Sequence, residues 1–227
     1  MKGSLQIRAG LLVLMCLAWL TGCGSSPEID RSLVETGDRT DLMNAAASGD
    51  RPAVERALSA GARINAIGPD GTALYLATVN EHDEVLWFLL REGARVDRGL
   101  ADGTTPLMEA AALGHSRMVE MLLRGGADVN SANDAGDTAL SYAALNSQLA
   151  VTNRLLRAGA DVDVIDANGE SLLMRVVARN DLLLSGVLVD AGADVEHERP
   201  DGLTALDVAQ ANNNEDLRIM LSNAAGN

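Results

Sequence analysis

The sequence predicts an all-α solenoid of about six helix-turn-helix repeats with projecting finger loops. A Gly-Ala-Arg or Gly-Ala-Asp tripeptide recurs at intervals of 32, 33, 33 and 33 residues, beginning at Gly61, Gly93, Gly126, Gly159 and Gly192. Twenty-one residues before each of these glycines stands a hydroxyl residue: Thr40, Thr72, Thr105, Thr138 and Ser171. Thr204 begins a sixth copy. Self-similarity at such a fixed period is the sequence signature of a repeat architecture.

The composition agrees with thin, stacked layers. The 227-residue chain is 47% hydrophobic but only 2% aromatic, so few large rings are available to fill one thick core. Small and branched aliphatic side chains supply the apolar mass, which favours short helices packed closely together. The length and composition are those of a globular chain of one or two domains.

The third copy shows how one unit folds. Thr105 is a natural N-cap, because its hydroxyl accepts from the free N–H groups of the first turn. Pro106 follows at the first helical position, and a short helix is expected to about Leu113. A second apolar face begins at Met118, and Gly126 ends that helix through a positive φ. One such unit cannot bury its own apolar face, but stacked copies can.

The third copy, DGTTPLMEAAALGHSRMVEMLLRGGADVNS, resembles the ankyrin-repeat family throughout. The resemblance covers residues 40–221, and it implies a domain at 40–227 with repeats starting near 40, 72, 105, 138, 171 and 204. The polar first and last copies suit the role of caps. In the family, a His at one repeat position usually connects neighbouring repeats through hydrogen bonds. Five copies have another residue there: Tyr75, Met108, Ser141, Met174 and Asp207. We therefore expect weaker coupling between repeats.

The N-terminus is expected to be a signal peptide. Lys2 and Arg8 precede an apolar run of twelve residues, Ala9 to Leu20. That run suits a signal peptide and is too short for a transmembrane helix, which needs about 20 residues. An uncleaved amphipathic core helix is an alternative interpretation.

The end of this segment, Leu20-Thr21-Gly22-Cys23, resembles the lipobox of bacterial lipoproteins. The resemblance implies a signal peptide at 1–22, acyl chains on Cys23, and a tether over residues 23–39. A plain secretory signal with an incidental Cys23 is the alternative. Gly24, rather than Asp, follows the cysteine, so the resemblance favours the cell envelope and, in a Gram-negative cell, the periplasmic face of the outer membrane.

The net charge of the mature chain limits the classes of partner it can bind. Removing Lys2 and Arg8 with the signal leaves 16 Arg against 32 acidic residues, a net charge of −16. Such an excess of acid argues against nucleic acid, whose phosphates require Lys and Arg.

Nothing in the sequence indicates an enzyme, a cofactor or a metal site. The mature chain contains no lysine, and there is no G-x-S-x-G motif. DVDVIDANGE, at residues 161–170, fails as an EF-hand loop, because placing Gly169 at position six puts Val164 first and Arg175 twelfth. His82 and His115 share one repeat position and are expected to be structural, while His197 is expected to be solvated.

The resemblance implies a concave strip for partner binding, formed by finger tips and the exposed side of each first helix. On the fingers the candidates are Asp102, Thr104, Asp134, Asp137, Asn168, Glu170 and Asp201. On the helices they are Tyr75, Met108, Glu109, Tyr142, Met174 and Arg175. An acidic edge around an aromatic and thioether centre suits a protein with a basic rim and an apolar patch.

Trp87 is a further candidate contact. It occupies the position of Glu120 in the third copy, normally the solvent-facing side of the second helix. Exposed tryptophan is enriched at binding hot spots. The alternative is that the tether, through Ile29, Leu33 or Val34, folds back over it.

Two functions follow from these observations. The first is a membrane-anchored adaptor that binds a protein through the concave strip, and it predicts that charged residues at Met108 and Tyr142 abolish capture without unfolding the chain. The second is an envelope structural protein that binds cell-wall glycan or another small ligand, with Tyr75 and Tyr142 stacking on sugars. An enzyme with an unrecognised acidic site is the weakest alternative.

Overall fold

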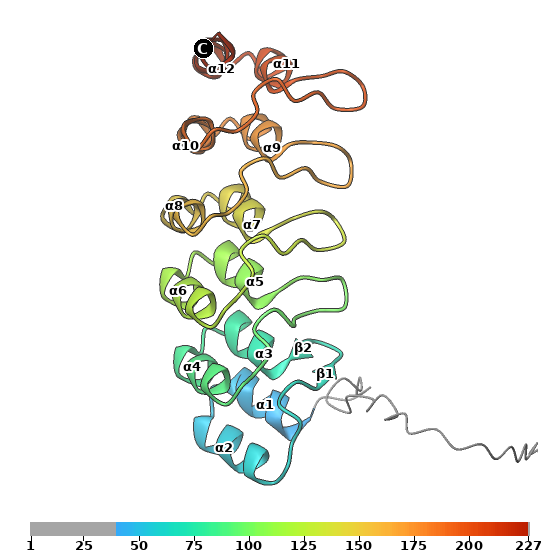
Figure 1. Cartoon of the computed structure of the whole chain (residues 1–227), viewed down its shortest axis with the longest axis vertical. Coiled ribbons are helices and arrows are strands. Elements are labelled where there is room, and N and C mark those ends of the chain that lie inside the picture. The colour runs from blue at the N-terminus through green and yellow to red at the C-terminus, as the bar shows by residue number, and fades with distance from the viewer. Residues whose placement is uncertain (1–39, 227) are drawn as a thin grey trace, which may run out of the picture. The chain divides into compact units, whose positions relative to one another are not determined.

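The computed structural model describes residues 40–226, which form twelve helices and one short β pair (Figure 1). The helices pair as α1 (Asp41–Ser48) with α2 (Arg51–Ser59), α3 (Ala73–Val79) with α4 (Asp83–Arg91), α5 (Pro106–Ala112) with α6 (Ser116–Arg124), α7 (Ala139–Leu145) with α8 (Leu149–Arg157), α9 (Leu172–Ala178) with α10 (Leu182–Asp190), and α11 (Ala205–Ala211) with α12 (Glu215–Ala225). The predicted helical solenoid of six repeats is therefore confirmed. The sequence did not predict the antiparallel pair β1 (Ile67–Gly68) and β2 (Gly71–Thr72) in the first finger.

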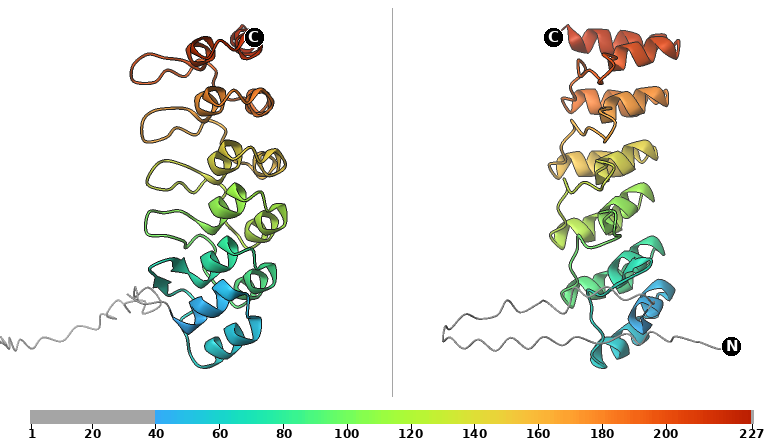
Figure 2. Two further views of the ribbon diagram at one scale, coloured as in Figure 1. Left: turned by 180° about the vertical axis from the view of Figure 1, so that it is seen from behind. Right: turned by 90° about the vertical axis from the view of Figure 1, so that its right-hand side faces the viewer.

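The six pairs stack in chain order, and each pair contributes to the same layers (Figures 1 and 2). The odd-numbered helices lie between the even-numbered helices on one side and the finger loops on the other. Each first helix packs on the first helix of the next repeat, as α1 does on α3 and α5 on α7. The fingers and the odd-numbered helices therefore share one face of the stack.

The repeated hydroxyls begin the first helices, as predicted. Thr72, Thr105 and Thr138 each accept a hydrogen bond from the backbone N–H three residues later, and Thr40, Ser171 and Thr204 do the same in their own repeats. Pro106 occupies the first turn of α5, where a missing N–H has no cost. Because the cap recurs at a fixed place, every first helix starts in the same register relative to its finger.

The glycine ladder ends the second helices. Gly126 has a φ of +88°, which side-chain-bearing residues rarely adopt, and its N–H bonds to the carbonyl of Leu123. Gly61, Gly93, Gly159 and Gly192 hold the same conformation at the same repeat position. The tripeptide period in the sequence thus reports a required backbone turn.

The core is one continuous row of small and aliphatic side chains. Leu107, Leu140 and Leu172 are fully buried, and Ala77, Ala110 and Ala143, at one repeat position, let adjacent helices approach closely. Burial of this row is the main stabilising force, at roughly 25 cal/mol per Å² of apolar surface.

Polar side chains add a ladder between consecutive repeats. In the loops after the second helices, Asn65, Asp97, Asn130 and Asp163 each accept a hydrogen bond from a backbone N–H of the following repeat, at 2.7, 3.1, 2.8 and 2.8 Å. These bonds couple the repeats in which the family's usual His is missing. The expected weakening of coupling stays a prediction.

Backbone hydrogen bonds also join neighbouring fingers. The Asp134 N–H donates to the carbonyl of Asp102 at 2.9 Å, and the Ala167 N–H donates to that of Ala135 at 2.9 Å. Pro200 stands at the equivalent place in the last finger and has no N–H to donate. There His197 and Arg199 make the connection through side chains, to Gly169 and Glu170 respectively.

The junction between the fourth and fifth repeats is packed least closely. Inner helices α7 and α9 approach each other less than other inner neighbours do, and α8 and α10 less than other outer neighbours. A surface groove opens between α8 and α10 as a result.

Within residues 40–226 no helix combines the length and apolarity needed to cross a membrane. The expected signal peptide, Cys23 and the tether lie outside the described residues, and so do Ile29, Leu33 and Val34.

Candidate protein-binding surface

An Asx side chain fixes the turn of each of the middle fingers. The Asn133 side-chain oxygen accepts from the N–H groups of Ala135 (3.1 Å) and Asp137 (2.9 Å). Asp166, one repeat later, accepts from the N–H groups of Asn168 (2.8 Å) and Glu170 (3.0 Å). Such Asx turns hold the residue before each helix cap at a defined place on the strip.

Tyr142 occupies the middle of the strip. It is half-buried on α7, and its hydroxyl accepts a hydrogen bond from the Asn133 amide at 3.2 Å. The Thr104 hydroxyl of the preceding finger lies 3.5 Å away. The ring is therefore held by two fingers while part of it faces solvent, which is the arrangement of a rigid aromatic contact.

Tyr75 instead bridges two repeats and lies inside. Its side chain is buried, and its hydroxyl donates to Glu109 Oε1 at 2.8 Å. Burial, with a further contribution from that hydrogen bond, raises the pKa of the Tyr75 phenol far above its ordinary value. Glu109 remains half-buried on the surface of α5.

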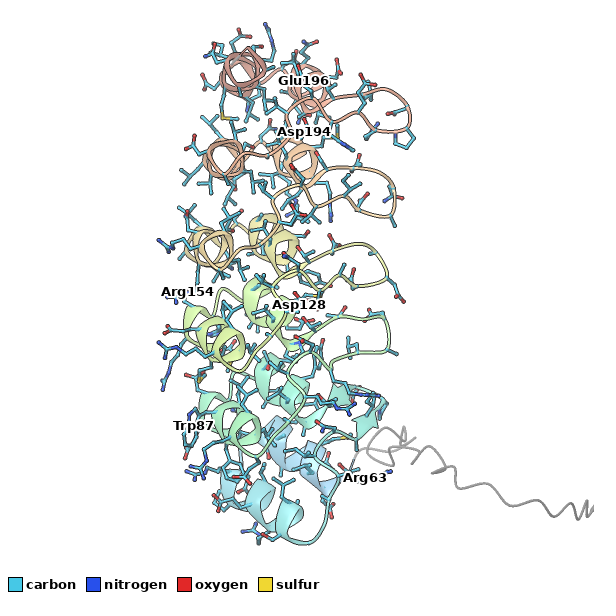
Figure 3. All side chains as sticks on the ribbon, viewed as in Figure 1. Arg63, Trp87, Asp128, Arg154, Asp194 and Glu196 are labelled. Carbon is cyan, nitrogen blue, oxygen red and sulfur yellow. The ribbon has the colours of Figure 1, made fainter. Side chains whose placement is uncertain are left out.

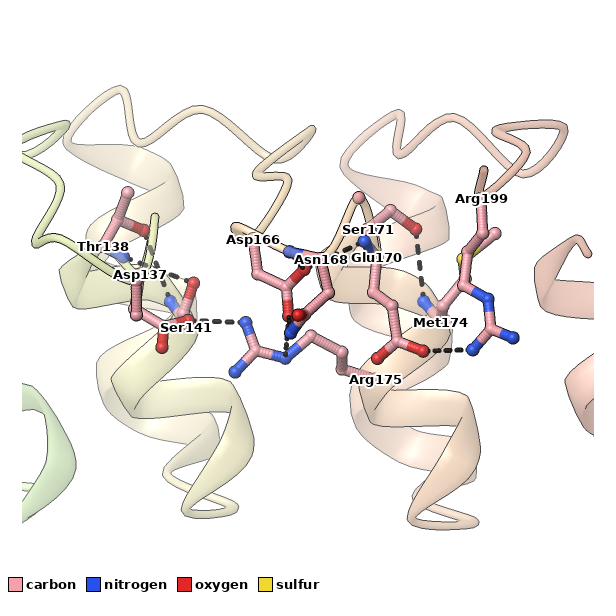
Figure 4. Close-up of polar contacts among 12 residues, drawn as sticks. Asp137, Thr138, Ser141, Asp166, Asn168, Glu170, Ser171, Met174, Arg175 and Arg199 are labelled. Atoms are coloured by element: carbon pink, nitrogen blue, oxygen red, sulfur yellow. Dashed lines mark hydrogen bonds and ion pairs between the residues drawn. The ribbon is translucent and has the colours of Figure 1, made fainter. Parts of the chain in front are cut away.

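Arg175 is the central cation of the strip (Figure 4). Its guanidinium donates to Asp137 Oδ1 at 2.5 Å and lies 3.9 Å from Asp166 Oδ2. Only 18% of the Arg175 side chain is exposed, so this is a largely desolvated ion pair between the fourth and fifth repeats. Burial alone would raise the pKa of Asp166, but the Glu170 and Asn168 hydrogen bonds and the Arg175 charge lower it below the usual value.

Arg199 makes the matching connection in the last finger. It forms a two-pronged ion pair with Asp201, at 2.6 and 3.1 Å. It also bonds to Glu170 of the preceding finger (Figure 4). The Arg199 hydrogen bond lowers the pKa of Asp201 below its usual value. The cationic groups on this part of the strip are thus already paired with acids of the same chain.

Four of the predicted contact residues are buried, and their predicted exposure was wrong. Met108 exposes 0% and Met174 2% of its surface, and Tyr75 and Thr104 expose only 6% and 3%. Met108 turns back to the helix cap, where its sulfur accepts the Thr105 N–H at 3.3 Å. These residues support the strip from beneath but offer no surface to a macromolecular partner.

The other predicted residues do lie on the surface. Exposed are Asp102, Asp134, Asn168 and Asp201; half-buried are Glu109, Asp137, Tyr142, Glu170 and Arg175. We call these nine residues the acidic strip. Asp134 has the freest carboxylate, because no side-chain bond to it is formed within residues 40–226. Asp102 accepts the Thr104 N–H at 2.9 Å through one oxygen, and its other oxygen forms no bond within residues 40–226.

Sequence reasoning missed the residues five positions before the caps. Asn133, Asp166 and Arg199 occupy that position in three consecutive fingers and organise the strip, so the 33-residue period was the available signal. It also missed Ile165 and Leu203, apolar finger residues that are 46% and 40% exposed. These two add apolar area beside the acids.

Trp87 is exposed as predicted, at 45%, on the outer side of α4 (Figure 3). The guanidinium carbon of Arg91 lies over its ring, 5.0 Å from the ring centroid. His82 bonds to the Ala47 carbonyl at 3.0 Å and His115 pairs with Glu81 at 3.1 Å, in agreement with a structural role. His197 is not simply solvated, because it is half-buried and 3.0 Å from the Gly169 carbonyl.

The chemistry of this surface suits binding. Residues 40–226 contain no cluster of His, Cys, Asp and Glu that would hold a metal ion. The acidic strip presents carboxylates and one ring, and Ile165 and Leu203 beside it add exposed aliphatic side chains. Together these groups match a protein surface that carries basic and apolar groups.

The fold and this surface define a class of repeat proteins that bind through loops on a stacked helical frame. The family model described as "Ankyrin repeats (3 copies)" matches at residues 42–133, 96–166 and 140–227. The chain belongs to the ankyrin-repeat family, whose members generally mediate protein–protein interaction.

A solved bacterial structure supports the same assignment. The chain is similar to an ankyrin repeat domain from Acinetobacter baumannii AYE, with 28% identity and a TM-score of 0.74 over 81% of this chain and 97% of that one. No curated protein shows a significant match to the sequence.

Proposed function

We propose that this protein is a membrane-anchored adaptor of the bacterial cell envelope, which binds a protein partner through the acidic strip. The observation that carries the proposal is the concentration of exposed carboxylates on successive fingers around the half-buried ring of Tyr142. Asp102 and Asp134 are exposed and form no ion pair within residues 40–226, while the nearby cations Arg175 and Arg199 are already paired with Asp137 and Asp201. The preferred partner is therefore a protein with a basic rim around an apolar patch.

The anchor rests on the sequence alone. The proposal takes residues 1–22 as a signal peptide and Cys23 as the acylated first residue of the mature chain, which places the domain at the periplasmic face of an outer membrane if the cell is Gram-negative. Two or three acyl chains give stable attachment, whereas one gives only marginal binding. Tethering raises the effective concentration of a partner at the membrane without new contacts.

The alternative function, glycan binding, depends on two tyrosine rings that would stack on sugars, and one of them is buried. Tyr75 exposes only 6% of its surface and its hydroxyl is bonded to Glu109. Only Tyr142 remains for stacking on a sugar, so the strip favours a protein partner.

Site-specific photo-crosslinking in intact cells tests the proposal. A photoreactive phenylalanine derivative replaces Tyr142 or, as a control on the outer helix α6 of the preceding repeat, the exposed residue Arg117. We expect one discrete crosslinked protein from position 142 and none from position 117, and we expect Asp134→Ala with Asp102→Ala to weaken it at least tenfold. Bands of equal strength from both positions would contradict partner binding by the strip.

The anchor is tested in the same cells. Cys23→Ser should move the protein from the membrane fraction to the soluble fraction and abolish palmitate labelling. Because the strip is unchanged, crosslinking of a purified partner through position 142 should persist. A chain that stays in the membrane fraction after Cys23→Ser would refute lipid anchoring and leave strip binding to be judged separately.

A further inference from the structure

Ion pairs connect consecutive outer helices through the first four repeats. Each of the first three junctions has one such pair, with N–O distances of 2.7, 3.1 and 3.1 Å: Arg51–Glu84, Asp83–Arg117 and Glu120–Arg154. Within residues 40–226, no ion pair connects α8 to α10 at the fourth junction. These are also the two outer helices that pack least closely.

The 33-residue period shows which side chains replace the missing ion pair. Asn153 and Val187 occupy the positions of Glu120 and Arg154, one repeat later. An amide and an isopropyl group cannot form an ion pair, and both side chains line the groove between α8 and α10. The groove therefore lies where the preceding junction has its ion pair.

Two buried hydroxyls lie on the same pair of helices. Thr152 on α8 and Ser185 on α10 are 0% exposed, and neither hydroxyl has a hydrogen-bond partner within the described residues. Leu86 and Val119, at the same repeat position in α4 and α6, are apolar and equally buried. A buried hydroxyl without a partner costs free energy, which is recovered when water reaches it. Separation of α8 from α10 therefore relieves a cost that the earlier junctions do not have.

The inner layer of this junction is held at both ends. At the finger end, Arg175 of α9 pairs with Asp137 at 2.5 Å. At the opposite end, in the turns between the helices, the Ser147 hydroxyl donates to Asp181 Oδ2 at 3.2 Å. The junction is thus closed along α7 and α9, whereas its outer side is held neither by an ion pair nor by close packing.

We propose that this junction is a hinge, at which the block of α9–α12 rocks about the inner layer against the block of α1–α8. In a solenoid each repeat contacts only its neighbours, so the array moves first at its weakest interface. Beyond the hinge the packing is close again, as it is between α9 and α11 and between α10 and α12. The last two repeats therefore move as one body, and the groove opens and closes as they do.

The hinge lies beneath the acidic strip. Asp137 and Tyr142 come before it in the array, and Glu170 and Arg175 come after it. Rocking changes the angle between these two parts and hence the curvature of the strip. If the strip binds a partner as proposed above, a partner that contacts both parts stabilises one of the two forms. This consequence rests on the proposed function, whereas the hinge itself does not.

Thiol labelling of the full chain, extracted from membranes in detergent, tests the hinge. Ser185→Cys places a thiol at a site that is 0% exposed, so a maleimide reacts with it only when the groove opens. Val119→Cys is the matched control, because Val119 is equally buried at the same repeat position of α6, whose two junctions both have their ion pairs. Mass spectrometry of the labelled peptides separates these sites from Cys16 and Cys23.

We expect Ser185→Cys to react about tenfold faster than Val119→Cys, because the control reacts only through larger openings of the array. Equal rates at the two sites would overturn the proposal.

Restoring the missing ion pair tests the cause of the opening. In the Ser185→Cys chain, Asn153→Glu together with Val187→Arg recreates the Glu120–Arg154 pair and should slow labelling about two- to fivefold, the range for an exposed ion pair. Neither substitution alone should slow it. Adding Thr152→Val, which removes a buried hydroxyl, should slow labelling by a further factor of about five. Labelling that is indifferent to all three changes together would overturn the proposal.

Hydrogen exchange measured by mass spectrometry distinguishes a hinge from local unfolding. Rocking leaves the hydrogen bonds within each helix intact, so the amides of α9 and α10 should stay protected on the timescale on which Ser185→Cys is labelled. Exchange of these amides as fast as the labelling would show that the helices unfold, and it would overturn the proposal.

Discussion

Two neighbouring junctions of the solenoid have the same frame but different interiors. Between the third and fourth repeats, α5 and α7 pack closely, and Val119 is buried in the outer helix α6. Between the fourth and fifth, the helices approach less, and the equivalent residues Thr152 and Ser185 bury hydroxyls that have no hydrogen-bond partner. The ion pair between Arg175 and Asp137 spans this second junction. The same 33-residue repeat therefore forms an apolar junction between one pair of repeats and a partly ionic junction between the next pair.

The largest effect is expected from a charge in the close-packed junction. Met108→Glu places a carboxylate at a residue that is 0% exposed and should cost about 4 kcal/mol of unfolding free energy. Urea denaturation followed by circular dichroism measures this loss.

Met108→Leu is the control for that substitution. It keeps an apolar side chain of similar volume and should cost less than about 1.5 kcal/mol. A stable, fully helical Met108→Glu chain would show that the close-packed junction tolerates charge, against the comparison drawn above. It would also revive the expectation that this position can be charged without unfolding.

A smaller loss is expected at the ionic junction. Arg175→Met removes the cation from Asp137 and Asp166, whose side chains are only 18% and 10% exposed, and should cost about 2 kcal/mol. Hydrogen exchange measured by mass spectrometry should become faster in α9 to α12 and stay unchanged in α3 to α6. Arg157→Met, a substitution at an exposed arginine at the end of α8 that forms no ion pair within residues 40–226, should leave both regions unchanged.

The cost of Arg175→Met should depend on pH. The folded-state pKa of Asp166 lies below its unfolded value, so its ionised form stabilises the fold above pH of about 4, and this contribution is lost as the pH falls through the folded pKa. The stability difference between the parent chain and the variant should therefore shrink below about pH 4. A difference that stays constant down to pH 2 would show that Arg175 stabilises by packing alone.

The smallest effect is a gain of stability. Thr152→Val keeps the shape of the side chain and removes a buried hydroxyl that has no hydrogen-bond partner. Val119, which is also buried, already occupies the equivalent position one repeat earlier. The expected gain is about 1 kcal/mol, which raises Tm by about 2–4 °C in a domain of this size. Thr152→Ser, which keeps the hydroxyl and loses the methyl group, should lower Tm. A lower Tm for Thr152→Val would mean that the hydroxyl is bonded after all.

The repeat frame was predictable because its signals are local. A capping hydroxyl such as Thr105 and a turn glycine such as Gly126 act within a few residues of themselves, and both have the conformations that the sequence predicted. Local chemistry repeated at a fixed interval leaves little freedom for the fold.

The inner strip was predicted less well, because adjacent helical positions differ by about 100° around the axis. Met108 and Met174 turn inward, whereas Glu109 and Arg175, one residue later, lie at the surface. The change from an apolar to a polar residue was the available signal. The partner of Arg175, 38 residues away in Asp137, had no local signal at all.

Pro200 has an evolutionary consequence. A main-chain bond such as that from Asp134 to Asp102 persists whichever side chains these residues carry, so finger sequences in the middle of the array can change without loosening the frame. The last finger is attached through the side chains of His197 and Arg199 instead, and one codon change removes either attachment. Selection therefore acts on the sequence of the last finger in two ways, through the partner it recognises and through the side chains that hold it in place. The middle fingers are held by main-chain bonds, so their sequences can change with fewer restrictions.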